Sequence, residues 1–272
     1  MTTDGILLAG CGNMGFALLK GWIAAGAAEP AAVSVVEPND VLRQRAAALG
    51  VGACADATEL PAGLAPRMVL FAVKPQVMSA VVPQYRRFSG SATFVSIAAG
   101  TPIRTIEGIL GSGAAVLRCM PNTPAQIGKG MLVTCANARV KPDEAAFVER
   151  LLATSGAVTS VEDERLMDAV TAVSGSGPAY VFHFIECLTT AAMNAGLPEE
   201  TAHLLAKQTV MGAGALAAES TETPARLREQ VTSPNGTTAA ALAVLMGEDR
   251  LKSLLGEAVE AARLRSIELG KS

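Results

Sequence analysis

The sequence is poor in aromatic residues, in histidine and in clustered basic residues. Aromatic side chains make up only 4% of its 272 residues, and His183 and His203 are the only histidines. The five cysteines are scattered without a C-x-x-C pair, which argues against a disulfide framework and against a metal site. The net charge of −3, with no Lys/Arg cluster, argues against nucleic acid as a partner. These absences predict a cytoplasmic protein with reduced thiols and no bound metal.

The sequence also lacks a long hydrophobic run. No apolar stretch approaches the roughly 20 residues that span a bilayer, and the N-terminus has no basic region of the kind that starts a signal peptide. Half of the residues are nevertheless hydrophobic, so Ala, Val, Leu and Ile must fill the core. The length allows two domains. We therefore expect no membrane segment and a two-domain chain of closely packed helices and sheet.

A glycine-rich stretch near the N-terminus follows an apolar run of strand type, residues 6–9. Gly10, Gly12 and Gly15 have the spacing G-x-G-x-x-G, and apolar residues then recur at helical intervals from 14 to 23. In a dinucleotide-binding turn these glycines permit the tight bend, the approach of the pyrophosphate and close helix packing, and the helix start offers free N–H groups. A plain glycine turn is the alternative. The predicted cofactor contacts here are Gly10, Gly12, Asn13, Met14 and Gly15.

Glu37 ends the next predicted strand, residues 33–36. It lies 22 residues after Gly15, where a dinucleotide fold carries the acidic residue that accepts hydrogen bonds from the ribose 2′-OH. A carboxylate there repels a 2′-phosphate, which favours NADH, although Arg43 and Arg45 could hold that phosphate if Glu37 turned away. Alternatively, Glu37 simply ends a strand in water.

Later strands also end in residues that suit a ligand. Apolar runs at 68–73, 93–97 and 114–119 alternate with helical segments, which predicts a mostly parallel sheet with helices on both faces. Ligands of such sheets lie off the carboxyl ends of the strands. Strands at 131–135 and 157–161 complete the predicted sheet. The further predicted cofactor contacts are Ala72, Val73, Lys74, Pro75, Ala98, Ala99, Gly100 and Asn122, with a solvated charge as the alternative for Lys74 and a plain turn for Asn122.

From residue 163 the pattern becomes entirely helical. We expect a Rossmann-type dinucleotide-binding domain at 1–162 and an all-α domain at 163–272. The segment 174–178 is either a flexible Gly/Ser linker or the start of a helix at Pro178. That helix is apolar nearly all round, which predicts burial inside a second domain or a dimer.

A hydroxyl-rich loop precedes the last two predicted helices. Residues 232–238, Thr-Ser-Pro-Asn-Gly-Thr-Thr, run into an Ala/Leu-rich helix, so their hydroxyls and backbone N–H groups could bind an anion. An ordinary turn with a Thr cap is the alternative.

Taken together, these motifs resemble the pyrroline-5-carboxylate reductase family over most of the chain. The family's signature loop usually has two glycines after its proline, whereas this chain has Asn235 at the first. Because Asn tolerates positive φ, we expect the loop shape to survive. The matching segments are Gly10-Cys11-Gly12-Asn13-Met14-Gly15, Ala72-Val73-Lys74-Pro75, Ser96-Ile97-Ala98-Ala99-Gly100, Met120-Pro121-Asn122-Thr123-Pro124-Ala125, Ser174-Gly175-Ser176-Gly177-Pro178-Ala179-Tyr180 and Val231-Thr232-Ser233-Pro234-Asn235-Gly236-Thr237-Thr238.

The resemblance implies hydride transfer from NADH or NADPH to the C=N carbon of 1-pyrroline-5-carboxylate, giving L-proline. It also implies a helical dimerisation domain, with homodimers that can assemble into decamers. By resemblance Thr238 lies near the ring nitrogen as the catalytic group, and the nicotinamide lies against Ala98 to Gly100 and Asn122. The implied substrate-binding residues are Ser233, Asn235, Gly236, Thr237 and Thr238.

Two other functions fit parts of the pattern. A two-domain imine or β-hydroxyacid oxidoreductase shares the glycine fingerprint, but those dehydrogenases generally use a lysine in the first long helix of the second domain, and residues 178–196 contain none. A non-catalytic dinucleotide sensor has no need of a second anion site, so the 232–238 loop favours an enzyme.

Overall fold

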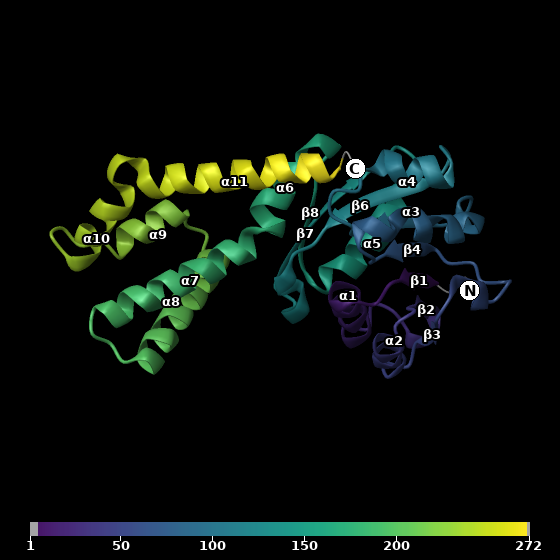
Figure 1. The fold of residues 1–272 in the computed structure, drawn as a ribbon, viewed down its shortest axis with the longest axis horizontal. Coiled ribbons are helices and arrows are strands. Elements are labelled where there is room, and N and C mark those ends of the chain that lie inside the picture. The colour runs from purple at the N-terminus through teal and green to yellow at the C-terminus, as the bar shows by residue number, and fades with distance from the viewer. Residues whose placement is uncertain (1–4, 271–272) are drawn as a thin grey trace. The chain divides into compact units, whose positions relative to one another are not determined.

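The computed structural model describes residues 5–270, drawn in Figure 1. The chain divides into two compact units: Met1–Ser176 together with Ala262–Ser272, and Gly177–Ala261. In the described part of the chain, no helix is both long enough and apolar enough to cross a membrane. Each unit is described below by itself.

The first unit is built on an eight-stranded sheet with the order β3-β2-β1-β4-β5-β6-β7-β8. The first six strands are parallel, and their apolar residues are nearly all buried, as expected of strands covered on both faces. The strands are β1 (Ile6–Ala9), β2 (Val33–Val36), β3 (Gly52–Cys54), β4 (Met68–Phe71), β5 (Thr93–Ser96), β6 (Ala115–Met120), β7 (Gly130–Ala136) and β8 (Gly156–Ser160).

Strand β7 reverses the direction of the sheet. It pairs antiparallel with β6, and β8 pairs parallel with β7. The connection at 121–129 explains the reversal, because it holds only a short 3-10 turn (Thr123–Ile127) and a parallel crossover needs a dozen or more residues. The predicted mostly parallel sheet is confirmed, with its last two strands reversed.

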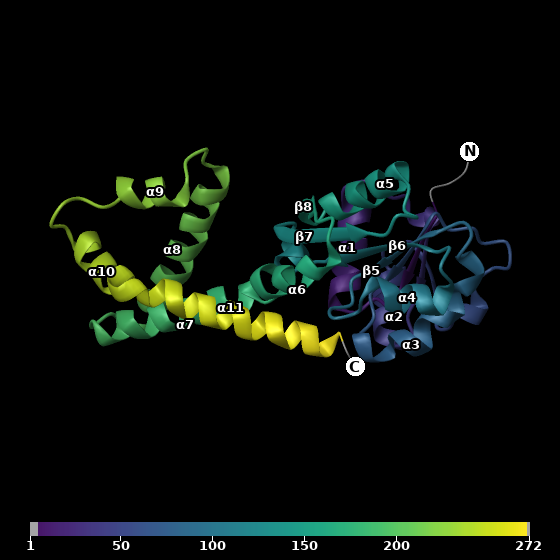
Figure 2. The same ribbon diagram turned by 90° about the horizontal axis from the view of Figure 1, so that it is seen from above.

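Helices cover both faces of this sheet. On one face α1 (Asn13–Ala24), α2 (Asp40–Ala47) and α5 (Pro142–Ala153) bury one hydrophobic core. On the other, α3 (Met78–Val81), α4 (Ile103–Leu110) and α6 (Met167–Val170) bury a second. Figure 2 shows α5 on one side of the strands and α3 and α4 on the other. The doubly wound, Rossmann-type class predicted from the sequence is confirmed.

The segment that joins the two units is helical. Thr171–Gly175 forms a π-helical turn in which the Ser176 N–H donates to the Thr171 carbonyl at 2.8 Å, and α7 begins at Gly177. The flexible-linker alternative for 174–178 is therefore wrong, and the helix starts one residue before Pro178. The compact first unit extends to Ser176, beyond the predicted border at residue 163.

The second unit is entirely helical, as expected. Its apolar side chains are widely exposed: Phe182 on α7 is 58% exposed and Leu204 on α8 is 66% exposed. The predicted burial of α7 inside a second domain does not occur within one chain, where Thr189 is its buried residue. Burial in a dimer remains the prediction. The helices are α7 (Gly177–Asn194), α8 (Glu199–Glu219), α9 (Pro224–Gln230), α10 (Thr237–Met246) and α11 (Arg250–Leu269), whose last turns belong to the first unit.

Candidate active site

The predicted cofactor residues come together at one edge of the sheet. The glycine loop follows β1, Glu37 follows β2, and the segments at 72–75 and 98–100 follow β4 and β5. Asn122 follows β6. All five strands are parallel, so these turns share the carboxyl edge, where doubly wound sheets bind their ligands. The chain leaves β1 toward β2 and returns to β4 on its other side, which makes the β1/β4 boundary the topological switch point.

Gly10 and Gly15 are required by the packing of the glycine loop against the end of β4. Gly10 has φ +87°, and a Cβ there would lie 2.6 Å from Val73 Cγ1. A Cβ on Gly15 would lie 2.7 Å from the Gly10 carbonyl oxygen and 2.9 Å from the Ala72 Cβ. All three distances are shorter than real Cβ contacts, so only glycine at these two positions lets the loop and the helix lie this close to the strand.

Gly12 is different, because space remains in front of it. A Cβ on Gly12 would meet no atom of residues 5–270 within 4 Å. Gly12 is also the N-cap of α1, and no side-chain hydrogen bond caps that helix in the described residues. An uncapped helix start with no acidic residue in its first turn leaves N–H groups and a positive dipole end for a phosphate. These residues fit the pyrophosphate of a dinucleotide.

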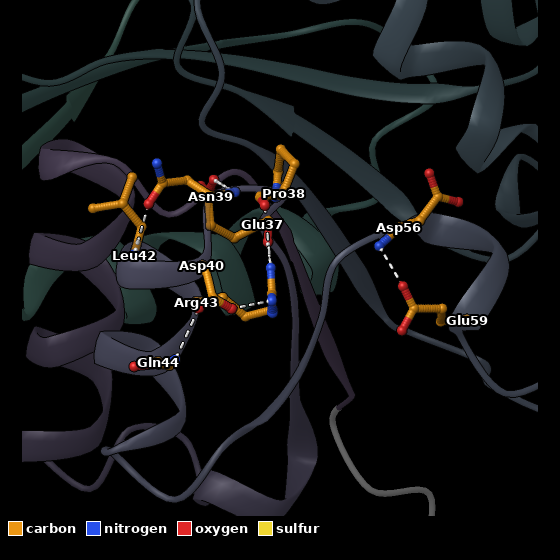
Figure 3. A network of polar contacts seen from close by, with 9 residues as sticks. All are labelled: Glu37, Pro38, Asn39, Asp40, Leu42, Arg43, Gln44, Asp56 and Glu59. Carbon is orange, nitrogen blue, oxygen red and sulfur yellow. Dashed lines mark hydrogen bonds and ion pairs between the residues drawn. The ribbon is translucent and has the colours of Figure 1, made fainter.

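Glu37 holds the glycine loop and the β2–α2 turn together. Its side chain is 6% exposed. Oε2 accepts from the Cys11 N–H at 2.7 Å, and Oε1 accepts from the Asn39 N–H at 2.9 Å. Figure 3 shows this turn, where Asn39 in turn caps α2 by accepting from the Leu42 N–H. The alternative in which Glu37 merely faces water is wrong, because the carboxylate is fixed at the loop.

The two arginines after Glu37 are also committed to backbone carbonyls. Arg43 donates to the carbonyl of Glu37 at 3.0 Å and forms an ion pair with Asp40. Arg45 donates to the Cys11 carbonyl at 2.9 Å, and its guanidinium lies 4.0 Å from the centre of the Phe16 ring. Both cations therefore brace the loop around Glu37. Each guanidinium keeps donors outside these bonds, and the Arg45 Nε has no hydrogen-bond partner among the described residues.

Cys11 lies inside the glycine loop but is not a nucleophile at neutral pH. Burial raises the pKa of its thiol to about 11, an effect that Arg45 only partly offsets. The neutral thiol behaves as a small apolar side chain.

The segment at 98–100, predicted to contact the nicotinamide, is a tight turn that lies against the end of α11. Gly100 has φ +68°, and a Cβ on it would lie 3.2 Å from the Leu269 Cβ. Nearby, Ser266 of α11 donates to Asp168 Oδ1 at 2.6 Å. No sequence motif indicated this contact, because it joins residues that are far apart in the chain.

Asn122 uses its side chain within the protein. Its Oδ1 accepts from the Met131 N–H at 2.9 Å, and its Nδ2 donates to the Ser174 carbonyl at 3.1 Å. The plain-turn alternative does not account for these two bonds, which tie the β6–β7 connection to the π-helical turn. Sequence analysis did not assign a contact to Ser174, although it lies in the Ser-Gly-Ser-Gly-Pro motif. Such single π-turns are frequent at functional sites.

The hydroxyl-rich loop keeps the expected shape. Asn235 has φ +57°, in the left-handed region, as predicted for the position where the family has glycine. The Gly236 N–H donates to the Ser233 carbonyl at 3.1 Å, and a Cβ on Gly236 would lie 2.5 Å from Ser233 Oγ. Gly236 is the N-cap of α10, which no side chain of the described residues caps. Thr237 and Thr238 form its first turn, so this loop, in the second unit, presents uncapped N–H groups and hydroxyls.

Comparisons with known proteins agree along the whole chain. The family model described as pyrroline-5-carboxylate reductase dimerisation matches residues 164–269, and one described as NADP oxidoreductase, coenzyme F420-dependent, matches residues 5–100. The chain is 40% identical to the pyrroline-5-carboxylate reductase of Pseudomonas aeruginosa, over all of this chain and 98% of that one.

Solved structures give the same result. A pyrroline-5-carboxylate reductase from Coxiella burnetii is similar, with a TM-score of 0.93 and 34% identity over the full length of both chains. The Plasmodium falciparum pyrroline carboxylate reductase with NADP bound has a TM-score of 0.84 at 29% identity, covering 99% of each chain.

Proposed function

Because the chain belongs to the pyrroline-5-carboxylate reductase family, we propose the residue roles by which it carries out that reaction. It is an NAD(P)H-dependent oxidoreductase that reduces the C=N bond of 1-pyrroline-5-carboxylate to L-proline, the last step of proline biosynthesis. The β-hydroxyacid and sensor alternatives gain no support. The observation that carries the substrate assignment is the Ser233–Thr238 loop, whose backbone ends at an uncapped helix start.

Glycine-loop N–H groups at the start of α1 hold the pyrophosphate, in the space in front of Gly12. The turns after β4, β5 and β6 carry the remaining cofactor contacts, with exposed Lys74 as a donor to ribose or phosphate. Glu37 accepts from the adenosine ribose hydroxyls. We propose a preference for NADH on this basis, since the carboxylate is fixed at the glycine loop, where it repels a 2′-phosphate.

The substrate carboxylate is held by Ser233, Gly236, Thr237 and Thr238, with Asn235 shaping the loop. The charge of the ligand suits the dipole and the free N–H groups at the start of α10. The Thr238 hydroxyl lies toward the ring nitrogen as its hydrogen-bond partner.

NAD(P)H supplies the hydride when bound. The chain's residues position the imine and stabilise its charge, and Thr238 holds the proton of the ring nitrogen by hydrogen bonding. An imine nitrogen is basic enough to be protonated near neutral pH, so positioning and electrostatics can provide most of the barrier reduction without a strong acid.

The enzyme oligomerises through its helical region, and we propose a homodimer as the minimal unit, with a decamer as the larger assembly. Exposed apolar residues on α7, α8 and α10 support this, because a monomer rarely exposes a large contiguous apolar surface. We also propose that the functional border lies near residue 163, close to where the dimerisation family model begins.

The decisive experiment follows the absorbance of NADH and NADPH with 1-pyrroline-5-carboxylate. Thr238→Ala should lower kcat by about tenfold or more, the effect of losing one hydrogen bond to a charged group, while cofactor affinity stays unchanged. Thr238→Ser keeps the hydroxyl and should retain most of the activity. An unchanged kcat in the alanine variant removes Thr238 from the mechanism, and no oxidation of either cofactor by the wild type refutes the substrate assignment.

A further inference from the structure

A small cavity in the first unit lies between the start of α4, strand β6 and the last turn of α11. Its volume is about 210 Å³, below the roughly 300–1,000 Å³ of pockets for drug-sized ligands. Its lining combines charges of both signs with apolar surface from Pro102 and Ile267. It also includes Gly100, from the segment proposed to contact the nicotinamide. The cavity therefore suits a small polar molecule.

Several of the charged groups in the lining are already paired. Glu164 Oε1 accepts from the Ile103 N–H at 2.8 Å and from Arg118 Nη1 at 3.2 Å. Asp168 Oδ1 accepts from Ser266, and Arg165 is paired with Asp163 at 2.7 Å. These contacts fix the walls of the cavity and leave a short list of groups for a ligand.

Two arginines in the lining have unused donors. Arg118 is 4% exposed, and its Nη2 has no hydrogen-bond partner among the described residues. Arg104 is exposed in the first turn of α4, with no partner for its guanidinium in residues 5–270 and no acidic residue in that turn. A cation at a helix N-terminus opposes the helix dipole, and a buried unpaired guanidinium N–H group is costly. Both positions favour an anionic group in the cavity.

The same cavity offers a negative group. Asp168 uses Oδ1 for Ser266, and Oδ2 accepts no hydrogen bond from the described residues. A free anion would be repelled by this carboxylate, whereas a molecule that carries an ammonium close to its carboxylate satisfies both sides. Pro102 and Ile267 provide apolar contact for a small hydrocarbon body.

We propose that this cavity binds a small α-amino acid as its zwitterion, with the carboxylate toward Arg104 and Arg118 and the ammonium toward Asp168. L-Proline belongs to this chemical class; its role as the ligand in the cell rests on the proposed function. Through Gly100 the bound amino acid contacts the nicotinamide segment, which couples occupancy of the cavity to the reaction.

Calorimetric titration of the full-length oligomer with L-proline and with L-alanine tests the proposal. Arg104→Gln should weaken binding of both by about tenfold, the loss of one hydrogen bond to a charged group, without lowering the melting temperature. Arg139→Gln removes an exposed arginine on the β7–α5 connection and should change nothing. Arg104→Lys should recover part of the affinity.

Three outcomes would overturn the proposal. The first is a single class of L-proline binding that Thr238→Ala abolishes and Arg104→Gln leaves unchanged. The others are binding of sulfate or acetate as tight as that of L-alanine, and no binding of either amino acid. The test is independent of the catalytic assignment, because Arg104-dependent binding of L-alanine remains measurable even if 1-pyrroline-5-carboxylate is not reduced.

Discussion

We propose that the choice between NADH and NADPH depends on Glu37, and replacing Glu37 with Gln gives a sharp test. The substitution keeps the shape of the side chain and removes its charge. We expect the ratio of kcat/KM for NADH to that for NADPH to fall, because the carboxylate both accepts from the ribose hydroxyls and repels a 2′-phosphate.

The magnitude follows from the contacts of Glu37. A hydrogen bond to a charged group contributes about 1.5–3 kcal/mol, so losing the charged acceptor should lower the ratio by about 10- to 100-fold. The amide of Gln can accept from only one of the two N–H groups, of Cys11 and Asn39, that the carboxylate now binds. The other is left unpaired near a buried side chain, so the unfolding free energy should fall by about 1–3 kcal/mol.

Glu59→Gln is the matched control. Glu59 is exposed and accepts from the Asp56 N–H at 3.0 Å, a bond that Gln can also make (Figure 3). This variant should keep the wild-type cofactor ratio in steady-state assays and the wild-type stability. A wild-type kcat/KM at least tenfold higher with NADPH would refute the role of Glu37.

Three further predictions follow from the geometry of the loops and the buried thiols. Gly15→Ala should lower the melting temperature because the added Cβ overlaps the glycine loop. Gly12→Ala should leave the melting temperature unchanged and weaken cofactor binding in a fluorescence titration. Equal melting temperatures of the two variants would contradict the predicted overlap at Gly15. Asn235→Ala should lower the unfolding free energy by about 1 kcal/mol, because residue 235 has a left-handed backbone that Ala adopts poorly, whereas Asn235→Gly should not lower it. Thermal unfolding of both variants measures this difference. Equal losses of stability would refute backbone strain as the cause. Burial raises the pKa of the Cys11 thiol to about 11 and that of the Cys119 thiol to about 12, from 9.0, so their contribution to stability is complete below pH 9 and is lost as pH rises toward 12. Replacing both with Ala should flatten this alkaline decline of the unfolding free energy in denaturant titrations. An unaltered decline would show that these thiols do not cause it.

Much of the first unit could be predicted because its signals are local. Short apolar runs followed by glycine or proline marked the strands, and each predicted strand was found within two residues of its position. The reversal at β7 was missed, since strand direction depends on the length of the connection rather than on the strand's own residues. The helical join at Thr171–Gly175 was left open because Gly and Ser are typical of linkers, and the hydrogen bond from Asn122 to the Ser174 carbonyl is a long-range contact that the local pattern does not reveal.

The same distinction applies to the candidate site. The glycine loop and Glu37 were predictable because their spacing along the chain reflects a single local unit. The contacts of Gly100 with Leu269 and of Asp168 with Ser266 were not, since they join residues about one hundred or more positions apart and leave no periodic pattern. The exposed apolar faces of the second unit were not predicted for the same reason, because their proposed burial against a second subunit cannot be inferred from a local pattern in one chain.

Two helix starts, those of α1 and α10, are the proposed ligand sites, and several other helices begin with a capping or acidic group that these two lack. Side chains cap α2 and α9, acidic residues occupy the first turns of α5 and α8, and Glu164 accepts from the first N–H of α4. Helices α1 and α10 have no such group in the described residues; each has a glycine N-cap with an extended backbone. Uncapped N–H groups cost free energy unless something else binds them. We therefore propose that the reductase uses one device twice, with the start of α1 for the pyrophosphate and the start of α10 for the substrate carboxylate, an arrangement that binds two anionic ligands with few charged side chains.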